Sequence, residues 1–328
     1  MLAGVQIICF AASYAVAFIL EVSRMVFRSG VRGALMLGFA AAGLVAHTAY
    51  LYHRAVNTPG SPLSSEQDWY LIAAWLLVAV YLYLMWYHPR QSFGLFLLPL
   101  VLALIGVGKL LARSEPFARE PASRVWGLIH GTAILLATVT VLVGFAAGVM
   151  YLHQDRRLKR KLPPPRGVRL PSLEWLARVN GRALVVAVLM LVVGVVSGVV
   201  LSALRRAGGL DLLPWHDPVV FATLVMLLWL LSAVAITARY PIQRQGRKVA
   251  YLTLVSFVFL AVALAAMLLL DTAHGGKNQD NTARAAVGWV VPAAKAAGFT
   301  HVIAESDCSG SRFRVPGRPH NVHSHTEA

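Results

Sequence analysis

Eight apolar stretches, each long enough to cross a lipid bilayer, occupy most of the first 271 residues of the chain. A spanning helix needs about 20 apolar residues, and apolar runs of that length face lipid or neighbouring helices. The predicted spans are residues 2–20, 33–52, 69–87, 92–112, 125–152, 183–204, 218–238 and 249–271. The sequence therefore predicts an all-α fold, a polytopic transmembrane helical bundle of about eight spans.

The Lys and Arg between the spans fall mainly on alternate loops. Segments 21–32, 87–91, 155–182 and 239–248 hold 17 of the 30 Lys and Arg, nine of them in segment 155–182 alone. The opposite connecting loops hold about seven, partly balanced by Asp and Glu. By the positive-inside rule, the first set of loops is cytoplasmic. An even number of spans then predicts that both termini are external.

The composition agrees with a membrane protein and excludes several other classes. Basic cytoplasmic loops account for the formal net charge of +16, so the predicted partner of these loops is the lipid bilayer and not nucleic acid. The two cysteines, Cys9 and Cys308, form no Cys-x-x-Cys pattern. No thiol redox motif, zinc finger or covalent haem attachment site is therefore predicted.

Two regions outside the spans have their own predicted structure. The fifth helix is expected to run on into the basic segment 156–161 and to end at Pro163. After it, Ser172 is expected to cap a short interfacial helix that carries Trp175 at the headgroup level. Residues 1–274 form the predicted transmembrane domain, and residues 275–328, rich in Gly, Ser, Asn and Pro, form an external polar tail that is expected to be flexible.

Several histidines gather at the predicted external face: His47, His53, His130, His216 and His274. Ionisable groups at depth in a bilayer are costly and are usually functional, and His47 and His130 meet this condition best. The structural alternative for each is a neutral imidazole hydrogen-bonded to a neighbouring helix. Two neutral imidazoles on facing helices suit haem iron, which takes two axial ligands.

Other residues near this face would complete a porphyrin site. Trp126, Trp215 and Trp229 are expected to lie on or near it, although aromatic residues gather at membrane interfaces in any case. Arg124, Arg205 and Arg206 supply positive charge for the haem propionates.

Four segments resemble the cytochrome c assembly membrane family, in its short eight-helix branch with CcsA, ResC and HemX. Residues 128–159 are similar to that family's histidine-initiated helix, which closes on a Tyr-Leu and a basic run. Residues 170–174 resemble the entry to its next helix, and residues 46–51 resemble its second-helix histidine motif. His274 matches the family's second external ligand, so the resemblance covers roughly residues 1–275.

The resemblance implies a haem-binding membrane protein of cytochrome c maturation, multi-pass in the bacterial cytoplasmic (inner) membrane. It would hold or present haem at the external face for attachment to apocytochrome c, with a ResB-like membrane partner protein. It implies non-covalent haem b whose iron is held axially by His130 and His274, with His47 as an inner ligand or relay. The further cofactor-binding residues it implies are Trp215, His216 and Asp217.

One departure from the family leaves other functions open. The family's external tryptophan-rich segment ends in Trp-Asp-Pro-Lys-Glu, whereas residues 215–220 read Trp-His-Asp-Pro-Val-Val. The missing Lys-Glu favours an alternative, a HemX-like accessory or regulatory protein of haem metabolism. A further alternative is a small-solute transporter, although the spans carry few charges and no obvious repeat. No nucleophile or base is arranged for catalysis, so a haem chaperone, within a haem lyase complex or alone, is predicted rather than an enzyme by itself.

Overall fold

The computed structural model describes residues 6–24, 30–57, 65–114, 124–161, 169–207, 217–239 and 246–269. Within these ranges every regular element is a helix, which confirms the predicted all-α fold class. The helices are α1 (Ile7–Ser23), α2 (Gly30–Asn57), α3 (Glu66–Tyr87), α4 (Gly94–Leu110), α5 (Arg124–Lys159), α6 (Leu173–Ala207), α7 (Pro218–Ala238) and α8 (Gly246–Leu269). The chain divides into two units after Asn278, and all described residues belong to the first.

Six of these helices, α2, α3 and α5 to α8, are long and apolar enough to cross a membrane. The apolar helices α1 and α4 have 17 residues each, which makes them about 26 Å long. That length is at the short end of the range for a spanning helix. Because α1 packs on α2 and α4, and α4 packs on α3, both belong to the bundle. The protein is an integral, multi-pass membrane protein.

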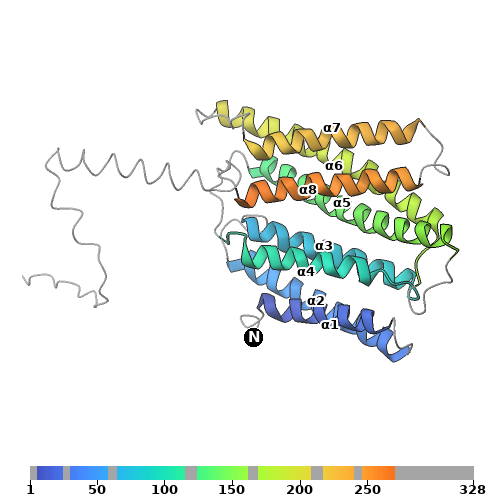
Figure 1. Ribbon diagram of the computed structural model, residues 1–328. Coiled ribbons are helices and arrows are strands. Elements are labelled where there is room, and N and C mark those ends of the chain that lie inside the picture. Colours follow the sequence, from blue (N-terminus) through green and yellow to red (C-terminus); the bar gives the residue numbers. More distant parts are fainter. Residues whose placement is uncertain are drawn as a thin grey trace, which may run out of the picture. The chain divides into compact units, whose positions relative to one another are not determined.

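The eight helices form two groups that meet at α5 (Figure 1). Helices α1 to α4 pack on one another, as do helices α5 to α8, and the α5–α6 pair has the most extensive contact. Helix α5 also contacts α3 and α4 of the first group. Helix α5 begins, and α8 ends, at the same end of the bundle (Figure 1). His130 lies near this end, since it is the seventh residue of α5.

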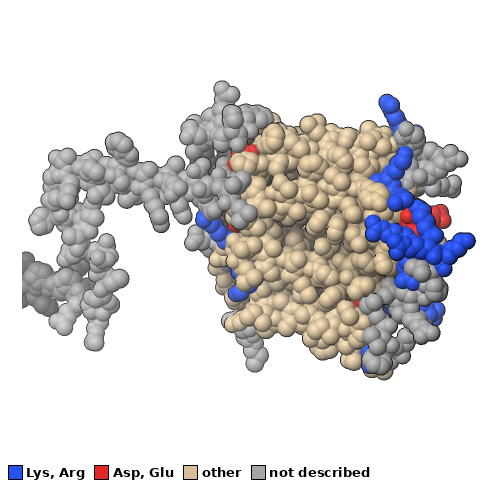
Figure 2. All heavy atoms as spheres, in the orientation of Figure 1, with Lys and Arg blue, Asp and Glu red and all other residues tan. Residues whose placement is uncertain are grey.

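The two ends of the bundle differ in charge. The described Lys and Arg side chains gather at the end where α5 stops and α6 starts (Figure 2). At the end of α5, Lys159 lies 3.0 Å from the carboxylate of Asp155, and Arg247 of α8 lies 3.9 Å from the same carboxylate. We refer to this end as the basic end and to the opposite end as the outer end.

The segment between α5 and α6 confirms one prediction and corrects another. Helix α5 runs on into the basic segment as predicted and ends at Lys159. The prediction of a separate interfacial helix is wrong, because α6 starts at Leu173 and continues without a break to Ala207. Ser172 does cap a helix, since its hydroxyl accepts a hydrogen bond from the backbone N–H of Trp175 at 3.3 Å. The capped helix is the sixth span itself.

At the outer end, Arg54 joins three helices of the first group. It lies at the end of α2 and forms an ion pair with Asp68, whose side chain is 2% exposed. Its guanidinium also donates to the side chains of Gln67 (3.1 Å) and Ser65 (2.9 Å) and to the backbone carbonyl of Ser114 after α4 (3.0 Å). The ends of α2 and α4 are thereby tied to the start of α3.

We expect the Arg54→Ala variant to be strongly destabilised, because it leaves the buried Asp68 carboxylate without its cation. Breaking a buried ion pair in this way costs about 3–5 kcal/mol. The free energy of unfolding in mixed detergent micelles measures this loss.

The matched control is Arg178→Ala, since Arg178 pairs with Glu174 at 3.8 Å on an exposed turn of α6. Exposed pairs of this spacing contribute about 0.3–0.5 kcal/mol. Equal losses in the two variants would show that the Arg54 cluster does not stabilise the bundle.

Candidate functional site

His130 lies near the outer end of α5, about 9 Å along the helix from its first residue. Its Nδ1 lies 2.7 Å from the backbone carbonyl oxygen of Gly194 in α6. A carbonyl oxygen only accepts hydrogen bonds, so Nδ1 carries the proton and donates it. In the neutral ring, Nε2 is then the nitrogen with the lone pair. This is the form in which imidazole coordinates a metal.

Two glycines of α6 make room for the His130 ring. A Cβ atom on Gly198 would lie 3.0 Å from both Cε1 and Nδ1 of His130, and 4.0 Å from Nε2. A Cβ atom on Gly194 would lie 2.5 Å from Cδ1 of Ile134, one turn further along α5. The spacing Gly-x-x-x-Gly puts both positions on one face of α6, where small residues allow helices to approach closely.

The surface around His130 is apolar. His130 itself is half-buried, and Val125, Trp126, Leu128 and Ile129 on the same turns of α5 are exposed. On the next residue of α5, a Cβ atom at Gly131 would lie 3.0 Å from the ring of Trp69 in α3. Exposed apolar side chains of α5 thus lie on the turns around the imidazole, and such side chains suit the faces of a porphyrin as well as lipid.

His47 occupies a different place in the bundle. Its side chain is fully buried and faces α1, where its ring stacks on Phe10 with centroids 4.0 Å apart and 5° between the planes. The hydroxyl of Tyr14 is 3.3 Å from its Nδ1. The structure therefore places His47 between α1 and α2, and His130 between α5 and α6. The two predicted histidines are not brought together.

Among the other predicted residues, Asp217 caps α7, where its carboxylate accepts from the N–H of Val219 at 2.8 Å. Trp126 is exposed at the start of α5, as expected for the outer end. The prediction for Trp229 is wrong: it lies midway along α7, and its Nε1 donates to the Ser256 hydroxyl at 3.1 Å. Outside the described residues or side chains lie Arg124, Arg205, Arg206, Trp215, His216, His274 and the tail 275–328.

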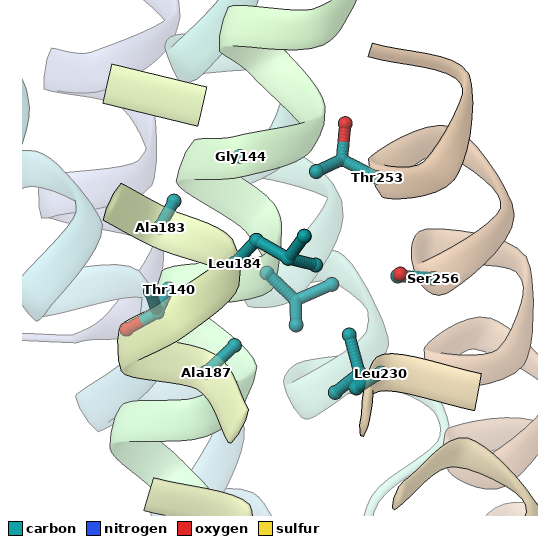
Figure 3. A pocket seen from close by; sticks show the side chains of 9 residues that line it. Thr140, Gly144, Ala183, Leu184, Ala187, Leu230, Thr253 and Ser256 are labelled. Carbon is teal, nitrogen blue, oxygen red and sulfur yellow. The ribbon is translucent and has the colours of Figure 1, made fainter. Parts of the chain in front are cut away.

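A small cavity lies inside the second group of helices (Figure 3). Thr140 and Gly144 of α5, Leu230 of α7, and Thr253 and Ser256 of α8 are among its lining residues. Its volume of about 10 Å³ is close to the minimum for one water molecule. The cavity lies far below the size of a porphyrin, so it is not a haem pocket.

Sequence reasoning missed the residues that α5 packs against around His130. The Gly194 and Gly198 pair shows the spacing of close helix contacts, and this signal could have identified α6 as the neighbour. Trp69 lies at the start of an apolar span and has no feature that separates it from other interfacial tryptophans. Its contact with α5 follows only from the three-dimensional packing.

The comparisons with known proteins give one family. Residues 35–274 match the family described as Cytochrome C assembly protein. The match begins within α2 and extends past the end of α8, so it covers more than half of the chain and leaves α1 outside. No curated protein and no solved structure matches the chain.

We expect Phe10→Ala to destabilise the contact of α1 with α2, because Phe10 is fully buried and covers one face of the His47 ring. Removing a buried phenylalanine costs about 3–5 kcal/mol. Phe221→Ala is the matched control, since Phe221 is 65% exposed on α7 and should change stability by less than about 0.5 kcal/mol. Unfolding in mixed micelles measures both, and a Phe10→Ala variant as stable as the control would contradict the packing of α1 over His47.

Proposed function

Because the match covers most of its length, the chain belongs to the cytochrome c assembly protein family, and we propose that it binds haem b non-covalently at the outer end of α5. Family membership gives the protein a role in cytochrome c maturation. Within cytochrome c maturation, we propose the more specific role of holding haem for attachment to apocytochrome c.

The observation that carries this proposal is the hydrogen bond from His130 Nδ1 to the Gly194 carbonyl oxygen. Histidines that bind metals usually donate their other ring N–H to a carbonyl or carboxylate, which fixes the ring and makes the ligating nitrogen more basic. His130 is held in that way. Its lone pair is on Nε2, the atom that would coordinate iron.

The second axial ligand in the proposal is His274. Helix α8 packs on α5 and ends at Leu269, at the same end of the bundle as His130 (Figure 1). His274 follows five residues later in the sequence. His216 and Trp215 precede Asp217, which caps α7, and we propose that they contribute to the same haem site.

His47 is a less direct candidate. An inner-ligand role would require the surrounding side chains to move, because iron binds an imidazole nitrogen in the plane of the ring and the Nε2 atom of His47 is buried inside the bundle. We therefore assign the axial pair to His130 and His274.

In cytochrome c maturation, the chain's own residues would do three things. Iron coordination by His130 would retain haem at the membrane surface. The exposed apolar residues of α5 and the Trp69 ring would lie against the porphyrin and exclude water from its faces. A neutral imidazole that releases haem reversibly would allow transfer to the Cys-x-x-Cys-His motif of an apocytochrome, with a ResB-like protein as the proposed partner.

The proposal requires the outer end of the bundle to face away from the cytosol. The gathering of Lys and Arg at the basic end supports this orientation through the positive-inside rule (Figure 2). The external face is where cytochromes c would receive haem if the membrane is the bacterial cytoplasmic membrane.

Cysteine labelling tests the orientation. In a Cys9→Ser, Cys308→Ser background, we expect Asn57→Cys at the outer end of α2 to react with a membrane-impermeant maleimide in intact cells. Lys161→Cys, after the end of α5, should react only after the cells are permeabilised. The reverse pattern would place His130 on the cytosolic side and contradict the proposal.

Haem binding is tested by the visible spectrum of the purified protein after expression with added haem. We expect a Soret band in the wild type and a loss of at least about tenfold in haem content in His130→Ala, because removing a metal ligand costs at least as much as removing one of its hydrogen-bond partners. The double variant His130→Ala, His274→Ala should be colourless.

His153→Ala is the control, since His153 is exposed near the other end of the same helix. It should retain its full haem content. A colourless wild type, or equal haem content in His130→Ala and His153→Ala, would refute the proposed site.

A further inference from the structure

We propose that the α6 face formed by Gly194 and Gly198 is a preformed seat, which sets the tautomer and the rotation of the His130 ring before any haem binds. The consequence of the seat for haem rests on the proposed function. The seat itself involves only described residues of α5 and α6. It can therefore be tested in the haem-free protein.

The tautomer follows from the partner of Nδ1. The Gly194 oxygen lies at 2.7 Å, a short distance for a hydrogen bond from N–H to a carbonyl. If the proton were on Nε2, the Nδ1 lone pair would face the carbonyl lone pairs at this distance and the contact would be repulsive. The bundle therefore selects the Nδ1–H form.

The rotation of the ring follows from the absence of a side chain at Gly198. The Cε1–Nδ1 edge of the ring lies where a Cβ atom of residue 198 would be 3.0 Å away, a distance that real Cβ contacts rarely show. Any larger residue would push this edge away from α6. Since the same edge carries the hydrogen bond, displacement of the ring would lengthen or break it.

The acceptor is also held in place. Ser197 is buried, and its hydroxyl donates to the carbonyl oxygens of Gly194 (2.9 Å) and Val193 (2.7 Å). On the α5 side, Ile134 fills the space over Gly194. The Ser197 bonds lie within α6 and hold the Gly194 carbonyl, and the Ile134 contact sets the spacing of α5 and α6 beside the imidazole, so that Gly194 and Gly198 act as positioning residues for His130.

The seat has a predictable effect on bound iron. Donation from Nδ1 to a carbonyl makes Nε2 a stronger electron donor, which favours ferric over ferrous iron. Weakening the seat should therefore raise the midpoint potential of bound haem. A tenfold change in the ratio of ferric to ferrous affinity corresponds to about 59 mV for a one-electron couple.

The first experiment observes the haem-free protein in detergent micelles by ¹⁵N NMR with labelled histidine. The His130→Ala variant identifies the His130 signals by their loss. We expect the wild type to show a protonated Nδ1 and an unprotonated Nε2 at His130. Gly198→Ala should shift the signals towards the Nε2–H form or towards a mixture of both.

Gly181→Ala provides a matched control. Gly181 is also in α6, and a Cβ atom there would meet nothing within 4 Å. This variant makes the same chemical change in the same helix, so the His130 signals should match those of the wild type. An Nε2–H form in the wild type, or identical spectra of Gly198→Ala and Gly181→Ala, would overturn the seat without any reference to haem.

The second experiment measures the haem-loaded proteins by spectroelectrochemistry. We expect Gly198→Ala to raise the midpoint potential by up to about 59 mV, a tenfold change in the affinity ratio, and Gly181→Ala to leave it unchanged. A higher midpoint potential in Gly198→Ala than in Gly181→Ala supports the proposed effect of the seat on iron. Equal potentials in the two variants refute that effect. If His130→Ala binds haem as the wild type does, the proposed function fails at His130, whereas the NMR result still decides whether the seat exists.

Discussion

The contact between α5 and α6 depends on two positions of α6 that carry no side chain. In lipid, helices gain little from burying apolar surface against each other, so close packing of the backbones contributes much of their association. Gly194 admits Ile134, and Gly198 admits the ring of His130. Since α5 also packs on α3, α4 and α8, this contact helps to fix the helix on which the two groups of the bundle meet. The same two glycines that allow the packing also give His130 its hydrogen-bond acceptor and its space.

Two polar groups in the bundle illustrate the rule that a buried donor needs a partner where water is scarce. Arg54 satisfies this rule with a carboxylate, two polar side chains and a backbone carbonyl. Trp229 does so with the Ser256 hydroxyl, midway along α7 and α8. These bonds join the consecutive helices α2 and α3, and α7 and α8, and Arg54 also reaches the backbone after α4. The polar residues thereby help to fix how these neighbouring helices rotate against one another.

The sequence predicted the helices well because apolar length and charged ends are local properties of the chain. The start of α6 at Leu173 was missed because a polar helical turn has the same backbone hydrogen bonds whether it lies along the membrane or continues a span. The depth of His47 and His130 also followed from their positions in the chain. The neighbour of each ring depends on how the helices rotate and pack, which no single span encodes. For that reason His47 faces Phe10 and His130 faces Gly194, although both were expected at one site.

Helix α5 has 36 residues and is about 54 Å long, whereas the hydrocarbon core of a bilayer is about 30 Å thick. This continuous helix therefore extends beyond the hydrocarbon core on at least one side. His130 lies near its outer end, and Arg156 and Arg157 lie in its last turns. A rigid helix turns as a whole. A rotation of α5 at its basic end would therefore also turn the residues at its outer end, because the helix is continuous from Arg124 to Lys159.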